Sequence, residues 1–519
     1  MENKFKTIIL STINILTSFL IIAVAFTTRT LIDKAVEDKP VKIYIILLII
    51  FTLIELSLRA IYQVLKNQMY LSIELNLKKE LFSSLLDNEI PDSLKYHTGE
   101  LSNIYLVDIK NIASGKTDTI PDIFANGSKA IFSFIALAIF DYKFLALLVA
   151  AGMLLYIVAK LFYRSIKNLQ KESLELDGQI NSFMQESIEN IRVIKALDAT
   201  ENAKIKLLQK VEKTKKTKTK KNHRIEVAEN GLSISMNISY LIAILYAIYK
   251  MMNKTMTYGD LYIFAQLVIL FETPLMSFAG YINKINIYRT SEVRVKEILS
   301  LPKEDTTQVI PDFDEIVFDD VSFSYDKEVI SHFSQSIKKN ELILFKGPSG
   351  VGKTTLFYLL LGFLKPTSGH IYIKYKEDTY EVSAKTRGLF SYVGQSNILF
   401  SGSLFENIKF FNPNVTNEKI LEVLELVNLR TELENREETI DIKLKEHGVG
   451  LSIGQIQRVL IAISLLQEKP IMLLDEFSSA LDEENERSIV ELLLKLNKTI
   501  IFISHRNIES NEIRRINLW

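Results

Sequence analysis

Residues 347 to 354 have the composition and spacing of a phosphate-binding loop. They match the pattern G-x-x-x-x-G-K-[ST] in full, after an apolar run at 341–346 and before a helical run. Glycines in such a loop let backbone N–H groups surround phosphates at a helix N-terminus, while the lysine reaches the terminal phosphates and the hydroxyl ligates Mg²⁺. We therefore predict a nucleotide phosphate site. Its residues are Gly347, Pro348, Ser349, Gly350, Val351, Gly352, Lys353, Thr354 and Thr355.

A carboxylate pair follows a second apolar run, at 471–475. Asp475 ends this run, so it is expected at the carboxyl edge of a parallel sheet, close to the phosphate loop. A carboxylate at that place holds Mg²⁺ in phosphate-loop enzymes. The adjacent Glu476 is the candidate general base or water-positioning group. The pair predicts hydrolysis of the bound nucleotide.

The run Leu451-Ser452-Ile453-Gly454-Gln455 resembles the signature motif of ATP-binding cassette (ABC) proteins. It lies between the phosphate loop and the Asp475 run, as in that family. The resemblance implies that the nucleotide is ATP and that the signature closes over the phosphate loop of a second copy. The residues it assigns to ATP are Ser452, Gly454 and Gln455. Ile453 departs from the family, which has a glycine there.

Other family elements follow from this resemblance. Gln395 resembles the glutamine that contacts Mg²⁺ and water, and Tyr325 resembles the aromatic residue that stacks on adenine. His505 resembles the histidine that assists hydrolysis, and residues 479–482 resemble the loop that follows the catalytic glutamate. The resemblance therefore implies a metal set of Thr354, Gln395 and Asp475.

Composition points to a membrane protein that carries a polar domain. Hydrophobic residues make up 48% of the 519 residues and charged residues 24%, which implies separate apolar and charged regions. The net charge is zero, so no overall field favours nucleic acid. Cysteine is absent, which excludes disulfides, thiolate metal sites and a cysteine nucleophile.

Six apolar stretches are candidate transmembrane helices. Residues 7–28 lack charge and are long enough to cross a bilayer, too long for a signal-peptide core. From Lys204 to Arg224 the chain has ten Lys or Arg and one Glu, so the long loops are expected in the cytoplasm. Asp141-Tyr142-Lys143 predicts a tight hairpin between the third and fourth spans. The predicted spans are 7–28, 43–65, 120–140, 144–162, 230–249 and 261–283.

These observations predict two domains. Residues 1–302 are expected to form an all-α, six-helix transmembrane domain of the ABC exporter type, and 303–314 a linker. Residues 315–519 are expected to form an α/β phosphate-loop NTPase domain, because short apolar strands alternate with helical stretches.

The resemblance implies an exporter half-unit in the cytoplasmic membrane of a bacterium, with its ATP-binding domain in the cytoplasm. A homodimer is favoured, because every catalytic residue is present, and a heterodimer with a different half-transporter stays possible. The expected contacts are membrane lipid and an amphipathic cargo, namely a peptide, a lipid or a drug-like compound. Six residues precede the first span, too few for a peptidase domain, and residues 506–519 leave no room for the family's C-terminal helices.

Two alternatives stay open. One is a regulatory half of a heterodimeric transporter, or an ATP-gated channel, with little hydrolysis of its own. The other is a soluble chromosome or repair ATPase, which the apolar spans argue against. Glu55, close to Arg59, and Glu272 lie within apolar spans and are candidate cargo contacts, although either could lie near a membrane interface.

Overall fold

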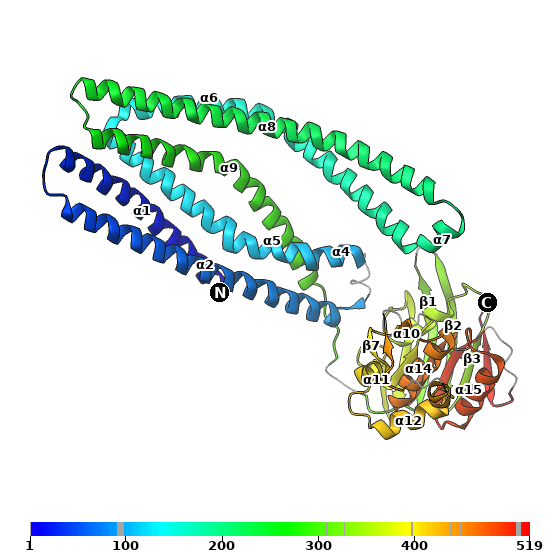
Figure 1. Cartoon of the computed structure of the whole chain (residues 1–519). Coiled ribbons are helices and arrows are strands. Elements are labelled where there is room, and N and C mark those ends of the chain that lie inside the picture. Colours follow the sequence, from blue (N-terminus) through cyan, green and yellow to red (C-terminus); the bar gives the residue numbers. More distant parts are fainter. Residues whose placement is uncertain are drawn as a thin grey trace. The chain divides into compact units, whose positions relative to one another are not determined.

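The protein is described here by a computed structural model. It covers residues 2–90, 98–306, 310–325, 327–395, 398–435, 439–445, 448–504 and 510–518. The chain divides into two compact units (Figure 1). The helical unit comprises residues 1–82 and 99–297, and the α/β unit comprises residues 83–98 and 298–519.

Long helices make up the helical unit. Two short π-helical segments, η1 and η2, interrupt the approach to its longest helix. In chain order the elements are α1 (Glu2–Val36), α2 (Lys42–Asp87), α4 (Thr98–Asn103), η1 (Ile104–Asp108), α5 (Ile109–Ser114), η2 (Gly115–Thr119), α6 (Ile120–Glu189), α7 (Ile191–Ala196), α8 (Thr200–Met252) and α9 (Tyr258–Leu299).

Five helical stretches among the described residues are long and apolar enough to cross a membrane. They contain the predicted spans 7–28, 43–65, 120–140, 230–249 and 261–283. The fourth predicted span, 144–162, lies in α6, but the side chains of 151–164 lie outside the described part. The helices extend well beyond the apolar stretches, so the segments expected as long loops are largely helical.

The predicted turn between the third and fourth spans is present within α6. Asp141 has φ −158° and ψ 94°, so the helix breaks there and the chain turns (Figure 1). The Asp141 carboxylate accepts hydrogen bonds from the backbone N–H groups of Lys143 and Phe144, both at 3.1 Å. An aspartate in this arrangement caps a new helix, which explains why the break falls at this residue.

The same end of the helical unit holds the α8–α9 turn and the end of α1. Tyr246 donates a hydrogen bond to Asp141 at 2.6 Å, and Arg29 pairs with Asp260 at 2.6 Å. The backbone N–H of Gly259 donates to Asp33 at 2.8 Å. The turns after the first, third and fifth predicted spans therefore gather at one end, as spans that cross in alternate directions require.

Three sheets organise the α/β unit. The central sheet is parallel, with strand order β11-β3-β10-β9-β6, and consists of β11 (Ile513–Asn517), β3 (Leu342–Lys346), β10 (Thr499–Ile503), β9 (Ile471–Asp475) and β6 (Phe390–Val393). An antiparallel sheet has the order β2-β1-β4-β5, with β2 (Glu328–Lys338), β1 (Glu315–Ser324), β4 (Ser368–Tyr375) and β5 (Asp378–Glu381). β7 (Gly402–Ser403) pairs with β8 (Lys443–Leu444).

The central strands β9 and β10 are buried at every residue, as expected for a sheet covered on both faces. Two apolar clusters form the core. In the first cluster, the helices between residues 404 and 495 pack against one face of the central sheet. In the second, the helix at 353–360 and the antiparallel sheet pack against the other face. The helices are α10 (Lys353–Leu360), α11 (Leu404–Phe411), α12 (Asn417–Leu426), α13 (Arg430–Glu434), α14 (Ile453–Leu466) and α15 (Glu483–Lys495), with a 3₁₀ turn η3 (Arg387–Leu389).

Candidate ATP site

Four parallel strands bring the predicted site residues to one edge of the central sheet. Phe345 near the end of β3 is paired with Ile503 of β10, and Ile503 is paired with Asp475 of β9. β6 lies beside β9 and ends two residues before Gln395. Because the strands are parallel, their carboxyl ends meet at the same edge, where ligands bind in open α/β sheets.

The phosphate loop has the backbone conformation that its glycines predict. Gly350 has φ 85° and Gly352 has φ 96°, both in the left-handed region that glycine adopts without strain. Gly352 is the N-cap of α10, so Lys353 begins the helix. Lys353 is 7% exposed, and its Nζ donates to the carbonyl oxygens of Gly347 (2.8 Å) and Pro348 (2.9 Å). The lysine is thus folded over its own loop.

The Asp475 carboxylate fits a magnesium ligand. It is 1% exposed, and neither oxygen has a hydrogen-bond partner among the described residues. Burial, aided by the Glu476 carboxylate, raises the pKa of Asp475, and the Thr354 hydroxyl and the Lys353 ammonium group oppose this. A buried carboxylate with unused acceptors is costly without a partner, and a bound cation would supply one.

This site supplies few protein ligands. No group of three or more His, Asp or Glu that could hold a metal occurs within the described residues. The donor set of one carboxylate, one hydroxyl and one amide, from Asp475, Thr354 and Gln395, leaves places for phosphate oxygens and water. That composition suits Mg²⁺, which commonly binds through one or two carboxylates plus substrate phosphates.

Glu476 is held beside Gln395 in a strained backbone conformation. The Gln395 Nε2 donates to Glu476 Oε2 at 2.9 Å, which joins two residues 81 positions apart in the chain. Glu476 has φ 51°, in the left-handed region that is unfavourable for a residue with a side chain. Its backbone N–H donates to Ile503 at 3.1 Å. Strain of this kind is concentrated at functional sites.

Of the two remaining predicted contacts, only Tyr325 lies within the described residues. Tyr325 follows β1 and is 58% exposed, with its ring edge-on to Phe323 at 4.8 Å between centroids. An exposed ring is free to stack on a base. His505 lies outside the described residues. The preceding Ser504 is buried at the end of β10, and its Oγ lies 3.4 Å from Ser478 Oγ.

The signature residues form the start of α14. Ser452 is the N-cap: its Oγ accepts the Gln455 N–H at 3.2 Å, and Gln455 Oε1 accepts the Ser452 N–H at 2.8 Å. The Ser452 hydroxyl proton is therefore still available to a phosphate. Ile453 is the first helical residue, lacks a positive φ and is 61% exposed, as predicted for a side chain that points out from a helix start.

Gly454 and Gln455 of the signature contact other residues of the same chain. A Cβ on Gly454 would lie 2.9 Å from the carbonyl oxygen of Ala480, so the close approach that requires glycine is to residues 479–482. Gln455 is fully buried, and its side chain is turned away from the surface. The S-x-x-Q spacing of a capping box predicts this orientation, which the resemblance alone did not reveal.

Comparisons with known proteins agree with this arrangement. The family model of the ABC transporter transmembrane region matches residues 5–275, and a second family model, described as ABC transporter, matches residues 330–479. The chain belongs to the ABC transporter family. It carries one membrane region and one ATP-binding region, which is the organisation of a half-transporter, and it is a multi-pass membrane protein.

Two bacterial relatives are similar to this transporter over most of its length. The lactococcin-A transport/processing ATP-binding protein LcnC of Lactococcus lactis is 30% identical over 79% of this chain and 58% of its own length. A Rickettsia typhi protein named for export ATP-binding and permease functions is 26% identical over 96% of this chain and 88% of its own. The transporter spans about three fifths of the lactococcin relative.

The fold is that of a known transporter. A bacterial Atm1-family ABC exporter with ATP bound superposes with a TM-score of 0.80 at 18% identity, covering 97% of this chain and 91% of that one. Both expected domain types, the helical membrane domain followed by an α/β ATP-binding domain, are confirmed.

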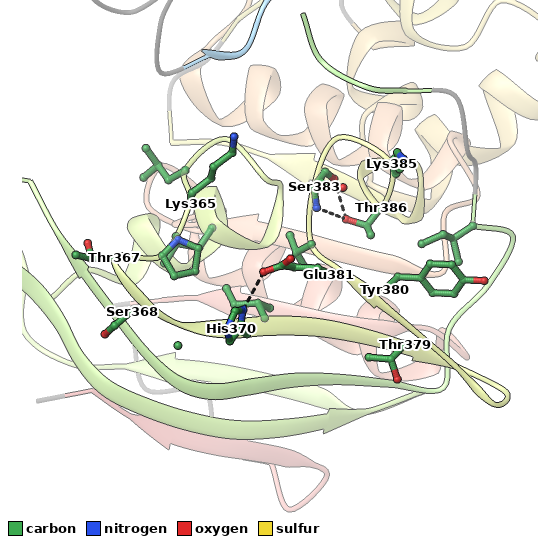
Figure 2. Close-up of a pocket in the computed structure, with 17 residues that line it drawn as sticks. Lys365, Thr367, Ser368, His370, Thr379, Tyr380, Glu381, Ser383, Lys385 and Thr386 are labelled. Atoms are coloured by element: carbon green, nitrogen blue, oxygen red, sulfur yellow. Dashed lines mark hydrogen bonds and ion pairs between the residues drawn. The ribbon is translucent and has the colours of Figure 1, made fainter. Parts of the chain in front are cut away.

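The transporter also has a cavity of about 720 Å³ outside the predicted ATP site (Figure 2). It is lined mainly by β4, β5 and the segments that flank them. The His370 ring is hydrogen-bonded to Glu381 at 2.9 Å, and the Thr386 hydroxyl accepts the Ser383 N–H. None of the predicted site residues lines it.

Sequence reasoning missed several residues that support the site. Burial and the Asp475 carboxylate raise the pKa of Tyr392, which indicates that Tyr392 lies near the predicted metal ligand. Gln457 binds the loop after Glu476: its Nε2 donates to Ser479 at 3.0 Å and its Oε1 accepts the Ala480 N–H at 3.3 Å. Gln457 lies next to the signature, but its contact depends on tertiary packing.

Proposed function

We propose that this chain hydrolyses ATP, as a dimer, to drive the export of an amphipathic cargo. The observation that carries the proposal is the meeting of Lys353, Asp475, Glu476 and Gln395 at one sheet edge, in a chain that also has an ABC membrane region. Lys353 and Asp475 account for binding, and Glu476 with Gln395 accounts for hydrolysis.

The chemistry follows from the groups at this edge. Lys353 would exchange its two loop carbonyls for phosphate oxygens, while backbone N–H groups of residues 349–355 surround the phosphates. Thr354, Asp475 and Gln395 would hold Mg²⁺, which supplies neutralisation of charge on the transferred phosphoryl group. Glu476 would orient and deprotonate the attacking water, with His505 as the predicted assisting group.

The second half of each site would come from another copy. Ser452 is exposed at the start of α14, its hydroxyl proton has no acceptor among the described residues, and a helix N-terminus favours a phosphate group. In the proposed dimer, Ser452 of each chain contacts the ATP bound to the phosphate loop of the other. Closure of both sites would then change which side of the membrane the cargo path opens to.

A peptide is the cargo class that we favour. The support is the name of the lactococcin-A relative, which describes transport and processing, and this support is by similarity only. Within the membrane region Glu55 is paired with Arg59 one turn later. Glu55 is therefore neutralised locally, which leaves Glu272 as the better candidate for a cargo contact.

ATPase assay of the purified chain in lipid nanodiscs tests this proposal. We expect Mg²⁺-dependent ATP hydrolysis by the chain alone, lost in the Glu476→Gln variant. A chain that binds ATP but has no activity unless a second, different half-transporter is added would contradict the homodimer and favour a regulatory half. A chain that is inactive in both conditions would contradict the enzyme.

A further inference from the structure

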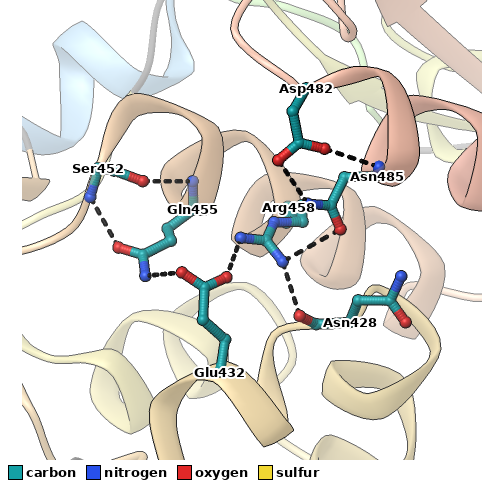
Figure 3. Close-up of polar contacts among 7 residues, drawn as sticks. All are labelled: Asn428, Glu432, Ser452, Gln455, Arg458, Asp482 and Asn485. Carbon is teal, nitrogen blue, oxygen red and sulfur yellow. Dashed lines mark hydrogen bonds and ion pairs between the residues drawn. The ribbon is translucent and has the colours of Figure 1, made fainter. Parts of the chain in front are cut away.

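A polar network that includes the buried side chains of Gln455 and Arg458 lies next to the signature segment (Figure 3). Gln455 is fully buried, and its Oε1 accepts the Ser452 N–H. Its Nε2 donates to Glu432 Oε1 at 2.7 Å. Since the amide oxygen accepts and the amide nitrogen donates, an acceptor on the nitrogen side fixes which way the Gln455 amide is turned. Glu432 of α13 thereby holds the group that caps the signature helix.

The same carboxylate binds a second residue of α14. Arg458, one turn from Gln455 and 5% exposed, donates to Glu432 Oε2. Its guanidinium also donates to the carbonyl oxygen of Asn428 at 2.6 Å. A buried cation needs both a counter-charge and hydrogen bonds, and Glu432 supplies the counter-charge. Each oxygen of Glu432 thus holds a different residue of the signature helix.

Arg458 extends this network towards the loop that follows Glu476. Its guanidinium lies 3.5 Å from Asn485 Oδ1. Asn485 in turn donates to Asp482, from its backbone N–H at 2.8 Å and from its side chain at 3.0 Å. Asp482 is the N-cap of α15 and ends the segment 479–482. The contacts run from α13 through α14 to the end of that segment.

We propose that Glu432 is a positioning residue for ATP hydrolysis. It fixes the Gln455 amide and Arg458, and through them the placement of Ser452 against the ATP of the partner chain. Glu432 contacts Gln455 and Arg458, so its proposed effect on ATP is indirect. This inference rests on the proposed function, because Ser452 acts on ATP only in a dimer.

Apolar packing, and not Glu432, attaches α13 to the domain. Leu429 and Leu433, on either side of Glu432, are 0% and 2% exposed within the first apolar cluster. The Glu432 side chain is about one third exposed. Loss of its carboxylate should therefore leave the domain folded and change mainly the orientation of the α14 start.

The test compares Glu432→Ala with Glu434→Ala. Glu434 lies on the same short helix, and its carboxylate pairs with the exposed Arg430 at 2.8 Å. We expect Glu432→Ala to lower kcat for ATP by about tenfold, with unchanged affinity for a fluorescent ATP analogue, because the phosphate loop is intact. Glu434→Ala should keep the parent kcat. Glu432→Gln, which retains a carbonyl acceptor, should recover part of the loss.

A double variant separates positioning from general damage. If Glu432 acts through the Gln455 amide, Glu432→Ala should lower kcat far less in a Gln455→Ala background than in the parent. Equal losses in both backgrounds, or a parent-like kcat in Glu432→Ala, would overturn the proposal while the parent remains an active ATPase. Absence of activity in the parent chain would instead contradict the proposed function.

Discussion

Asp475 carries a charge that the folded domain accommodates poorly until a cation binds. Its folded pKa is raised, so the folded protein holds this proton more tightly than the unfolded chain. The burial penalty is absent below the ordinary aspartate pKa and is complete once the pH exceeds the folded pKa. At neutral pH the ionised Asp475 therefore destabilises the nucleotide-free domain.

We predict that Asp475→Asn stabilises the nucleotide-free protein at neutral pH. A gain of about 1 kcal/mol corresponds to a rise of roughly 2 to 4 °C in the melting temperature. The gain should disappear at acidic pH, where the parent carboxylate is protonated. Thermal melts with and without Mg-ATP check this, because the variant should also lose most of the stabilisation by Mg-ATP. A variant that melts below the parent at neutral pH would contradict the prediction.

Glu476 and Lys353 should separate hydrolysis from binding. Glu476→Gln removes the proposed base but keeps a hydrogen-bonding side chain beside Gln395, so ATP should still bind. Turnover should fall by ~100-fold or more. Near-normal turnover in nanodiscs would show that another residue activates water.

Lys353→Ala should weaken nucleotide binding itself. The variant removes the ammonium group that is poised over the loop, and the loop backbone remains. Equilibrium binding of a fluorescent ATP analogue measures the effect, with Lys346→Ala, an exposed lysine at the end of β3, as the matched control. Equal affinities of the parent and Lys353→Ala would remove Lys353 from the ATP site.

At the scale of elements, the first two residues of α14 differ in the side chain that their surroundings allow: Ile453 is exposed, whereas Gly454 lies against the backbone of Ala480. Ile453 has an ordinary helical backbone and an exposed side chain, so a glycine there gains nothing sterically. We predict that Ile453→Gly changes the ATPase rate by less than ~10-fold, under about 1.4 kcal/mol of barrier. A chain that is inactive until Ile453→Gly is introduced would favour a heterodimer with one degenerate site.

Gly454 should tolerate no side chain. The added Cβ in Gly454→Ala would lie 2.9 Å from the carbonyl oxygen of Ala480. This oxygen belongs to the backbone, so it cannot move aside as the end of a flexible side chain could. We expect α14 to move away from residues 479–482 and the ATPase rate to fall more than in Ile453→Gly. An ATPase rate of Gly454→Ala equal to the parent's would show that this approach is not needed for turnover.

Motifs with a fixed local geometry could be predicted from the sequence. The phosphate loop and the Asp475 strand end are such motifs, because a strand, a loop and a helix in sequence fix where their polar residues lie. The hairpin at Asp141 was also predictable, since a short polar interval between two apolar spans leaves no other path.

Contacts that depend on packing between distant elements could not be predicted. Glu432 meets Gln455 across 23 residues, and Gln395 meets Glu476 across 81. Neither pair has a spacing rule. The packing of α8 along α6 could not be predicted either, because α8 is polar over much of its length and has no apolar stripe that indicates a partner.

At the scale of the whole molecule, each proposed ATP site requires two chains. The chain supplies a phosphate loop and an exposed signature serine on the surface of one α/β unit. In the proposed dimer, the Ser452 hydroxyl of one chain contacts a phosphate of the ATP held by the other chain. Dimerisation is therefore the claim on which the proposed function depends most.

The most direct measurement is cross-linking across the proposed shared site. The chain contains no cysteine, so Ser349→Cys and Ser452→Cys introduced together provide the only thiols. In a Glu476→Gln background with Mg-ATP, mild oxidation should join two chains into a species of doubled mass, and omission of ATP or use of either single cysteine should reduce it strongly. Absence of the cross-linked dimer at saturating Mg-ATP, in protein shown to bind ATP, would contradict the shared site and with it the proposed mechanism.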